Sequence, residues 1–512
     1  MRRLRSGSKN FGTSTTCNSA EMAVAPSAFR CRAFPQRSAG VLLHPTALPG
    51  PGPIGTLGAE AHRFVEALAA GGFTWWQVCP LGPTGYGDSP YQALSIFAGN
   101  PYLLDLVDLK HRGFLTSTET AQVQRGADHH TDYGRLWHEL RPLLKLAGAR
   151  AAQALSNEAS FLQYQAEQAP WLKAWCQFSA LREQNSFAAP STWTVTAADP
   201  ALCAEAAALQ FLFAEQWQAL RAHAQRHGIR LLGDEPIYVS ADGCDVRAHP
   251  QLFQLDTHGR PTAVAGVPPD YFAEDGQLWG NPLYDWTAHA ADGFAWWRAR
   301  VLHDLQLFDA VRIDHFRGLC DYWSVPAGAP NARGGAWHDG PGLAFTQAMG
   351  DLPLVAEDLG LLSPGVDILR HASGLPGMAV LQFGFGGSAD NPHHPDNVTA
   401  DRVVYTGTHD NDTLCGWLAT TTPEEQANLK ELLGAVDDVA AALTTAVLRT
   451  PAVCAILPAQ DLLGLGSEAR FNTPGHPQGN WTWRLTDAEF AELTRTLPTW
   501  RPRLAQSQRL NA

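Results

Sequence analysis

Eight short apolar segments, separated for the most part by helical stretches, constrain the fold of this chain more than any other feature. Each consists of β-prone residues and ends in polar or charged ones. Their apolar residues run on continuously instead of alternating, which is typical of strands in a parallel sheet that is buried on both faces. The segments are residues 40–44, 74–80, 230–239, 310–314, 354–357, 378–383, 403–408 and 453–457.

Eight βα units predict an α/β fold, the (β/α)8 TIM barrel, whose active face lies at the carboxyl ends of the strands. The predicted barrel domain spans residues 33–512. Two stretches between the predicted strands are too long for simple crossovers. Residues 100–210 are rich in Ala, Gln, Leu and Trp, and we predict that they form an inserted, mostly helical subdomain. Residues 240–292 are predicted to be a loop insertion on the active face.

The first 32 residues differ in composition from the rest of the chain. They carry six basic residues against one acidic residue and are rich in Ser and Thr, without a long apolar core. This composition excludes a secretory signal and resembles an organelle transit peptide. A disordered tail, or a true start at Met22, is the alternative. We therefore predict a disordered or transit-like extension at residues 1–32, in a cytoplasmic protein or, if the segment is a transit peptide, a plastid one.

The charge of the chain limits its partners. Lys and Arg number 37 and Asp and Glu number 50, so the formal net charge is 37 − 50 = −13. General nucleic-acid binding needs clustered positive charge, which this balance argues against. No apolar run is long enough to span a membrane. The nine cysteines include no CxxC pair and show no zinc-site spacing. We therefore expect no nucleic-acid partner, no membrane and no zinc site of the CxxC kind.

Acidic residues stand at the ends of four predicted strands: Asp234, Asp314, Glu357 and Asp410. Four acids that converge on one face are costly to desolvate unless function needs them. Arg312 precedes Asp314 by two residues, which places both side chains on the same face of a strand. The guanidinium would hold Asp314 ionised, as a nucleophile must be.

Paired carboxylates acting on an uncharged substrate indicate glycosyl transfer or hydrolysis. A divalent-metal site built from the same acids is the competing interpretation, weakened by the lack of a DxD or HxH cluster. Aromatic residues in polar, Gly- and Pro-containing loops favour a sugar ligand, because aromatic faces suit the C–H faces of sugars. These aromatics are Tyr86, Tyr91, Tyr271, Phe272 and Trp279.

Ten segments in order resemble the amylomaltases, also called disproportionating enzymes or 4-α-glucanotransferases, which form glycoside hydrolase family 77 of the α-amylase clan. They cover about residues 41–484, nearly the whole chain. The segments are LLHPTALPGPGPIG, PLGPTGYGDSPYQ, SIFAGNPYLLDL, GDEPIYV, VPPDYF, GQLWGNPLYDW, RIDHFRG, AEDLG, GTHDNDT and RFNTPGHPQGNWTWR. The amino-terminal extension is not part of this common core.

The resemblance implies a role for individual residues. Asp314 matches the catalytic nucleophile, Glu357 the general acid/base, and Asp410 the third acid, which binds sugar hydroxyls and stabilises the transition state. His44 matches a first-strand histidine, for which a structural role and sugar contact both stay open. The residues that match substrate-binding positions are Tyr91, Asp234, Asp270, Tyr271, Gln277, Trp279, Arg312, His409 and Asn472.

The resemblance further implies a retaining transferase that moves α-1,4-glucan segments between malto-oligosaccharides without a cofactor or metal. Retention predicts a separation of roughly 5–5.5 Å between the carboxyls of Asp314 and Glu357. Glu357 must stay protonated near neutral pH, so its pKa should be raised. We expect the loop with Tyr271 and Trp279 to cover the site and favour a sugar acceptor over water.

Three alternatives stay open at this point. An α-amylase-type hydrolase would use the same carboxylates and raise the number of reducing ends. A non-catalytic glucan-binding protein would bind without turnover. A metal-dependent barrel enzyme would lose activity with a chelator. The size of the products, the formation of cyclic glucans and the oligomeric state are not decided by the sequence.

Overall fold

A closed parallel β-barrel forms the centre of the protein. The computed structural model describes residues 31–85, 87–123, 129–269, 274–360, 363–476 and 478–510, so the predicted extension lies outside the described residues except for Cys31 and Arg32. All eight predicted strands are present. They are β1 (Ser38–Leu42), β2 (Trp75–Gln77), β3 (Arg230–Glu235), β6 (Ala310–Ile313), β9 (Leu354–Ala356), β10 (Gly377–Val380), β11 (Arg402–Tyr405) and β12 (Cys454–Pro458).

The barrel strands follow one another around the ring in chain order, and every pair is parallel. β1 pairs with both β2 and β12. Between β9 and β10, the backbone N–H of Ala356 donates to the carbonyl oxygen of Pro376 at 2.9 Å. The ring is therefore closed, and the predicted (β/α)8 barrel is confirmed.

Side chains fill the barrel interior. Every second residue of a barrel strand points into the lumen, and the apolar ones among these inward-facing residues form a buried hydrophobic cluster. Trp75 is its largest member, and the ring of Phe34 packs edge-on against it at 4.8 Å. Gly40 faces this crowded centre: a Cβ atom there would lie 2.6 Å from Trp75 Cβ and 2.7 Å from Ile456 Cδ1. Only glycine fits at that position.

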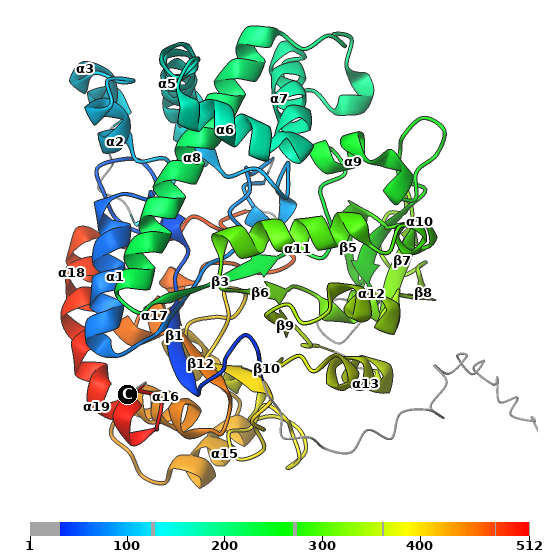
Figure 1. The fold of residues 1–512 in the computed structure, drawn as a ribbon. Helices are drawn as coiled ribbons and strands as arrows, with labels where there is room; N and C mark the ends of the chain where they lie inside the picture. The colour runs from blue at the N-terminus through cyan, green and yellow to red at the C-terminus, as the bar shows by residue number, and fades with distance from the viewer. Residues whose placement is uncertain are drawn as a thin grey trace, which may run out of the picture.

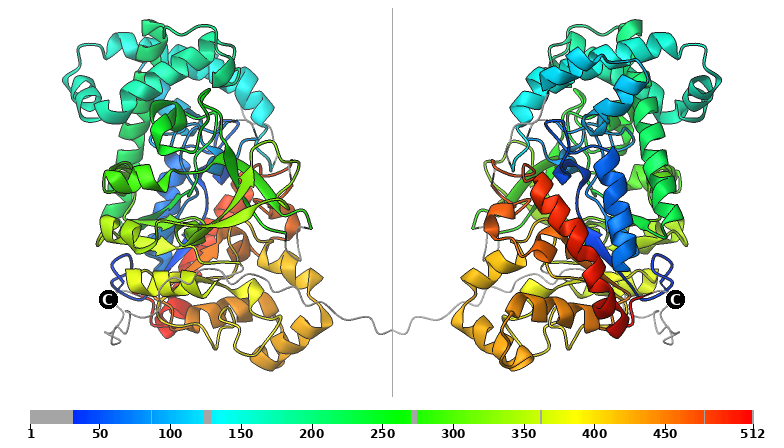
Figure 2. Two further views of the ribbon diagram at one scale, coloured as in Figure 1. Left: turned by 90° about the vertical axis from the view of Figure 1, so that its right-hand side faces the viewer. Right: turned by 90° about the vertical axis from the view of Figure 1, so that its left-hand side faces the viewer.

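Helices cover the outside of the barrel (Figure 1). The right-hand view of Figure 2 shows α18, α1 and α8 side by side on one flank of the barrel. The covering helices are α1 (Ala59–Gly71), α8 (Pro200–Arg226), α10 (Trp286–Ala291), α11 (Ala295–Leu307), α12 (Gly342–Met349), α13 (Pro364–Ser373), α14 (Leu414–Thr420), α15 (Pro423–Leu433), α16 (Val439–Arg449), α17 (Ala459–Leu463), α18 (Asp487–Thr496) and α19 (Arg501–Gln506).

A second group of helices lies above the barrel in Figure 1, between β2 and β3 in the chain. These are α2 (Leu106–His111), α3 (Ser117–Thr120), α4 (Tyr133–Arg135), α5 (Arg141–Ala154), α6 (Ala159–Glu167) and α7 (Ala169–Gln184). α8 joins the two parts, because it packs on α5 and α7 as well as on α1 and β3. The stretch predicted as an inserted, mostly helical subdomain, residues 100–210, thus shares the continuous 27-residue helix α8 with the barrel wall.

A four-stranded antiparallel sheet stands beside the barrel, in the strand order β5-β4-β7-β8. Its strands are β4 (Ala263–Val267), β5 (Gln277–Pro282), β7 (Asp321–Pro326) and β8 (Ala336–Asp339), and α9 (Cys244–Ala248) precedes it. Residues 240–292, predicted as a loop, therefore contain two strands. Their short, Gly-containing sequences carry little β signal, and β4 pairs with β7 more than 50 residues later in the chain.

Arg509, near the last described residue, links the first and last strands of the barrel. Arg509, fully buried, donates to four backbone carbonyl oxygens: Ser38 at 2.7 Å, Leu448 at 2.7 Å, Thr450 at 3.0 Å and Ala452 at 3.1 Å. These carbonyls belong to β1 and to the segment that leads into β12. The last described residues thereby tie the first and last strands of the ring together.

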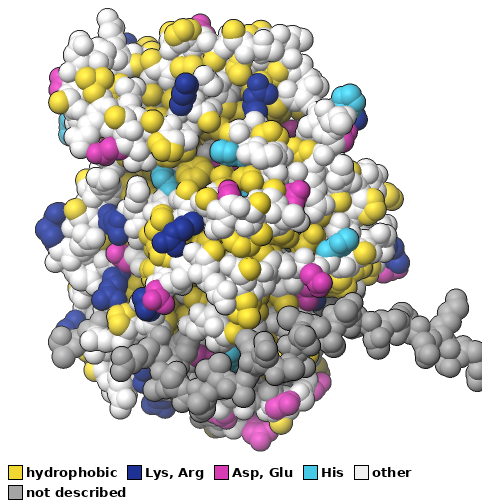
Figure 3. Space-filling view, turned by 45° about the vertical axis from the view of Figure 1, so that its right-hand side comes forward, with side chains coloured by type: hydrophobic (Ala, Val, Ile, Leu, Met, Phe, Trp, Pro, Cys, Tyr) yellow, Lys and Arg dark blue, Asp and Glu magenta, His cyan; other side chains and the backbone are white. Residues whose placement is uncertain are grey.

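Among the described residues, no helix combines the length and the apolar character needed to cross a membrane. Figure 3 shows one face of the molecule, where Lys and Arg side chains are interspersed with acidic ones.

Candidate active site

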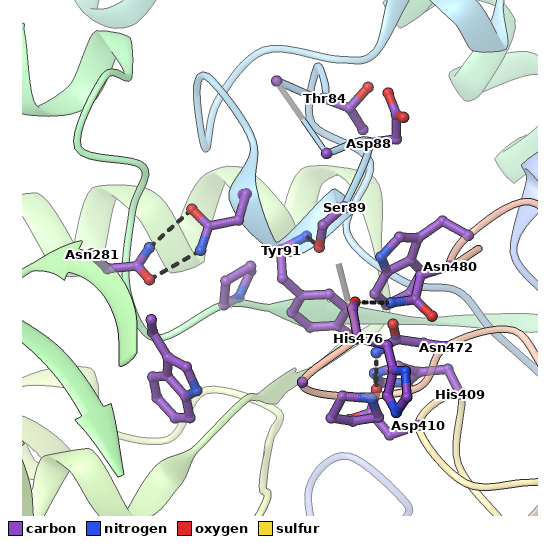
Figure 4. Close-up of a pocket in the computed structure, with 18 of the residues that line it drawn as sticks. Thr84, Asp88, Ser89, Tyr91, Asn281, His409, Asp410, Asn472, His476 and Asn480 are labelled. Atoms are coloured by element: carbon purple, nitrogen blue, oxygen red, sulfur yellow. Dashed lines mark hydrogen bonds and ion pairs between the residues drawn. The ribbon is translucent and has the colours of Figure 1, made fainter. Parts of the chain in front are cut away.

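A cavity of about 1810 Å³ opens at the carboxyl ends of the barrel strands. Loops of the barrel, the four-stranded sheet and the helices above it all contribute to its walls. Eight of the predicted site residues line it: Tyr91, Gln277, Trp279, Asp314, Glu357, His409, Asp410 and Asn472. Figure 4 shows Tyr91, His409, Asp410 and Asn472 gathered on one side and Asn281 on the other. The three predicted catalytic acids therefore share one cavity.

Asp234 and Arg312 lie underneath the cavity surface. They occupy paired positions on β3 and β6 and point into the lumen, where each is only 4% exposed. Arg312 donates through Nη1 to both Asp234 oxygens, at 2.6 and 2.7 Å, and through Nη2 to Asp314 Oδ1 at 3.0 Å. Tyr91 donates its hydroxyl to Asp234 Oδ2 at 2.8 Å. Arg312 and Asp234 thus hold Asp314 and Tyr91 in place from below.

The two neighbouring carboxylates keep Arg312 positively charged. Burial disfavours the cation, but the carboxylates of Asp234 and Asp314 outweigh burial and raise the pKa of Arg312 well above its usual value. A guanidinium fixed between two carboxylates is a permanent positive charge at the floor of the site.

Asp314 and Glu357 stand at the ends of the neighbouring strands β6 and β9. The backbone N–H groups of His315 and Leu359 donate to the two Glu357 oxygens, at 2.6 and 2.7 Å. His315 has a left-handed backbone with φ of 46°, at the tight turn after Asp314. Such strain in a non-glycine residue is typical of functional sites, where the surrounding structure maintains it.

Burial raises the pKa of Glu357 to about 7, with a further contribution from the charge of Asp314. The raised pKa that the sequence analysis expected is confirmed. Burial also raises the pKa of Asp314, to about 6, against the opposing attraction of Arg312. The guanidinium therefore acts in the direction that the sequence analysis expected, because it favours the ionised form of Asp314 while burial opposes it.

Asp410 follows β11 and projects into the cavity, with 44% of its side chain exposed. Asn472 donates through Nδ2 to Asp410 Oδ1 at 2.6 Å, and His409 Nε2 lies 3.3 Å from the same oxygen. Arg470 donates to the backbone oxygen of Asp410 at 2.7 Å. Asn472 and His409 therefore orient the carboxylate of Asp410, and Arg470 fixes its backbone.

An aromatic wall lies beside these acids. The rings of Tyr91 and His409 stack at 5.0 Å with an interplanar angle of 20°, and Trp481 lies 5.6 Å from Tyr91. Trp481 was not singled out from the sequence. The signal was present, because Trp481 stands in a Gly-containing polar segment, the same context that drew attention to Tyr91.

Residues on β5 form the opposite wall. Trp279 donates through Nε1 to Gln277 Oε1 at 3.1 Å, and its ring meets that of His315 edge-on at 4.9 Å. Asn281 and Gln92, which both line the cavity, exchange side-chain hydrogen bonds at 3.0 and 3.3 Å. The predicted binding residues Asp270 and Tyr271 lie outside the described residues.

The helices above the barrel supply an outer rim that the sequence analysis missed. Tyr133, Trp137, Arg182 and Phe187 all line the cavity. The rings of Trp137 and Phe187 meet edge-on at 4.6 Å, and the guanidinium of Arg141 lies over both. Nothing in their local sequence points to a site, because only the packing of the helical region over the barrel brings them there.

His44 lies behind the aromatic wall, buried and 6.3 Å from the ring of Phe471. Burial, with the nearby His409, lowers the pKa of His44 to about 3. The imidazole is therefore neutral throughout the physiological range, which suits a packing role.

Comparisons with known proteins agree with one another. Residues 43–490 match the family described as 4-alpha-glucanotransferase, glycoside hydrolase family 77. The 4-alpha-glucanotransferase of Thermus thermophilus is 44% identical over 481 residues, which cover 89% of this chain and 96% of that protein. The chloroplastic/amyloplastic enzyme of Arabidopsis thaliana is 40% identical over 473 residues, covering 88% of this chain and 82% of that one.

Among solved structures, the amylomaltase of Streptococcus agalactiae in complex with acarbose superimposes with a TM-score of 0.88. It is 33% identical, and the match covers 93% of this chain and all of that one. The amylomaltase of Corynebacterium glutamicum shares the fold, with a TM-score of 0.73 at 19% identity.

Proposed function

The chain belongs to glycoside hydrolase family 77, the 4-alpha-glucanotransferases, and from this premise we propose how its own residues carry out glucan transfer. The enzyme moves a segment of an α-1,4-glucan from a donor to the 4-hydroxyl of an acceptor glucan or glucose. One observation carries the assignment of residues: Asp314, Glu357 and Asp410 line a single cavity, and the first of them is bonded to a buried guanidinium.

In the first step, a carboxylate oxygen of Asp314 attacks C1 of the donor sugar. The bond between C1 and the glycosidic oxygen breaks, and Glu357 gives its proton to that oxygen, so the reducing-end fragment leaves with a free 4-hydroxyl. The hydrogen bond from Arg312 Nη2 to Asp314 Oδ1 orients the nucleophile. The raised pKa of Glu357 supports its role as the proton donor.

In the second step, the 4-hydroxyl of an acceptor attacks C1 from the side that the leaving group vacated. Glu357 takes the hydroxyl proton, and the bond to Asp314 breaks. Two inversions restore the α configuration. The separation of roughly 5–5.5 Å between the two carboxyls that this pathway requires stays a prediction.

The two acids are coupled in a way that suits this exchange of roles. The charge of Asp314 raises the pKa of Glu357. When Asp314 becomes an ester, that charge disappears, and the pKa of Glu357 falls. Glu357 is therefore a better acid before the covalent bond forms and a better base afterwards.

Binding of the reacting glucose is assigned to the wall around Asp410. Its carboxylate, held by Asn472 and His409, is an acceptor for sugar hydroxyls. The stacked rings of Tyr91 and His409 offer a surface for the C–H face of the ring. We assign Asp234 and Arg312 a positioning role, because both lie beneath the surface and act through Tyr91 and Asp314.

Preference for a sugar acceptor over water is assigned to the enclosing walls. Trp279 and Gln277 on one side and Trp137 and Phe187 on the other give a bound glucan apolar surface along a long cleft. An acceptor held there by many contacts competes with water for the covalent intermediate. We propose that Asp270 and Tyr271 also cover the site and favour a sugar acceptor over water.

Incubation with maltotriose, followed by separation of the products by length, tests the function. We expect glucose together with longer maltodextrins, at a constant number of reducing ends. Rising reducing ends without longer products would favour the hydrolase. Asp314→Asn should abolish turnover while maltoheptaose binding, measured by calorimetry, persists. A wild-type protein that binds without any turnover would favour the glucan-binding alternative.

The metal-dependent alternative has an observation against it. The place between Asp234 and Asp314 that a cation would take is filled by the Arg312 guanidinium, which satisfies both carboxylates. Activity that survives dialysis against a chelator would be the expected result, and its loss with recovery on adding one divalent metal would favour the alternative.

The compartment stays a prediction. The plant relative in the comparison carries a chloroplastic/amyloplastic designation. A fluorescent protein fused after residue 40, compared with a fusion to the whole chain, tests whether residues 1–32 direct import into an organelle; a diffuse signal from both favours the cytoplasm.

A further inference from the structure

Outside the barrel, far along the chain from the catalytic acids, α1 and the second half of α8 pack side by side (Figure 2). Each helix presents a pair of potential metal ligands four residues apart. His62 and Glu66 lie on α1, and His223 and His227 lie at the end of α8. Residues four apart share one face of a helix. The two pairs face each other across the contact.

The ligand atoms of three of these residues converge. One atom each from Glu66, His223 and His227 lies within 4.8 Å of the other two. The Nε2 atom of His223 is 3.3 Å from Glu66 Oε1, and the rings of His223 and His227 are 4.5 Å apart. Among the described residues, these three form the group of His, Cys, Asp or Glu side chains whose ligand atoms all lie within 4.8 Å of one another.

One of the converging atoms is buried and unsatisfied. His223 Nε2 is shielded from solvent and makes no hydrogen bond to any described residue, since its approach to Glu66 lacks hydrogen-bond geometry. A buried polar atom without a partner destabilises the fold unless something else satisfies it. The ring of His62 lies 4.9 Å from that of His223, and its Nδ1 is 3.0 Å from the backbone oxygen of Gly58. Orientation by a backbone carbonyl is the usual second-shell arrangement of metal-binding histidines.

We propose that Glu66, His223 and His227 bind a transition-metal ion, Zn²⁺ in the first place, which links α1 to α8. Two imidazoles and one carboxylate suit zinc, whereas Ca²⁺ and Mg²⁺ prefer oxygen ligands alone. The fourth position is open to water or to the neighbouring His62. His227 is also the C-cap of α8, where a positive charge is favoured by the helix dipole.

The position of this metal site in the barrel indicates a structural role. α8 ends only a few residues before β3 begins at Arg230, so the ligands lie at the amino-terminal end of the barrel strands. The catalytic acids lie at the opposite end. In barrels of this kind, the amino-terminal end contributes to stability and the carboxyl end to catalysis. Zinc should therefore raise the melting temperature without changing glucan transfer.

The test uses the full chain without a histidine tag, freed of metal by dialysis against a chelator. Equilibrium dialysis with Zn²⁺ and elemental analysis should give one ion per chain. The melting temperature should rise by about 2 °C or more at saturating Zn²⁺, and Co²⁺ should show the visible bands of a tetrahedral site. Less than half an ion per chain after dialysis would overturn the proposal.

Variants separate this site from adventitious binding. His223→Ala and His227→Ala should weaken Zn²⁺ binding at least about tenfold. The matched control is His258→Ala, since His258 is an exposed histidine outside the group, and its affinity should equal that of the wild type. If His223→Ala folds poorly, Glu66→Gln replaces a side chain that is 53% exposed and should weaken binding with the fold intact. Equal Zn²⁺ affinity in the wild type and the Glu66 and His227 variants would refute the site.

Discussion

Two buried arginines mark the two ends of the barrel, and they are stabilised in opposite ways. At the catalytic end, Arg312 is bonded to the carboxylates of Asp234 and Asp314, which raise its pKa well above the usual value. At the other end, Arg509 is bonded to four neutral backbone carbonyls. Burial, with a further contribution from the nearby charge of Arg37, lowers the pKa of Arg509 to about 9.

The comparison shows what each end is built to do. Arg509 donates to buried carbonyl groups at the start of β1 and around the end of α16, some of which it shares with Arg37. Its guanidinium thus serves the fold as a set of hydrogen-bond donors. Arg312 instead balances negative charge that the chemistry requires. The same residue type thus maintains the fold at one end and the ionisation of a nucleophile at the other.

Replacing Arg312 by Met should give the largest effect on catalysis. Without the guanidinium, Asp234 and Asp314 remain as buried acids with no counter-charge, and Asp314 loses the donor that orients it. We expect kcat for maltotriose to fall by about 10³-fold or more, from loss of both charge and position. The pKa of Asp314 should rise further, so the residual activity should begin at a higher pH. Wild-type activity in a folded Arg312→Met protein would contradict the role given to Arg312.

Replacing Arg509 by Met should affect stability and leave catalysis intact. The change removes the Arg509 donors of the Ser38 and Ala452 carbonyl oxygens, while Arg37 still donates to those of Leu448 and Thr450. We expect a loss of about 3 kcal/mol in the free energy of unfolding, from two unsatisfied buried oxygens and lost packing. Denaturant unfolding measures this loss. Well below the melting temperature, kcat per folded molecule should match that of the wild type. A kcat reduced as strongly as in Arg312→Met would show that Arg509 also contributes to catalysis, and would contradict the roles given to the two arginines.

The pH dependence of kcat/KM tests the charge balance at the catalytic end. Transfer needs Asp314 ionised and Glu357 protonated. Because the pKa of Asp314 is about 6 and that of Glu357 about 7, we expect a narrow bell-shaped profile with its maximum between the two. Activity should fall about tenfold per pH unit on either flank. The two apparent values belong to the coupled pair. A profile flat from pH 5 to 9 would contradict this assignment, and Arg509→Met should leave the profile unchanged.

The smallest effect is expected at the outermost part of the catalytic end. Trp137 lies on the rim formed by the upper helices, in contact with Phe187. Trp137→Ala should raise KM for long maltodextrins by about threefold to tenfold, in line with the loss of one aromatic contact. The kcat for maltotriose should stay the same, because this substrate is too short to need the rim. Leu146→Ala, at an exposed leucine of α5, is the control.

Much of the fold and of the candidate site follows from local sequence. Continuous apolar runs marked all eight barrel strands, because a strand buried on both faces needs such a run wherever its neighbours lie. The acids at the ends of β6, β9 and β11 could be placed together for the same reason: parallel strands in one ring bring their carboxyl ends to one edge. The spacing of Arg312 and Asp314 likewise fixed their common face.

Other features depend on contacts between residues far apart in the chain. β4 forms a strand between β5 and β7, and β7 lies more than 50 residues later in the chain. The rim residues Trp137 and Phe187 reach the cavity only because α8 carries the helical region over the barrel. The pKa of Asp314 could not be predicted from the sequence either, because it depends on the balance between burial, which raises it, and the charge of Arg312, which lowers it. Local patterns determined which elements form and which chemical groups they carry. Tertiary packing decided how deeply each group is buried and what surrounds it, because desolvation and long-range pairing are set by the assembled fold and not by neighbours in sequence.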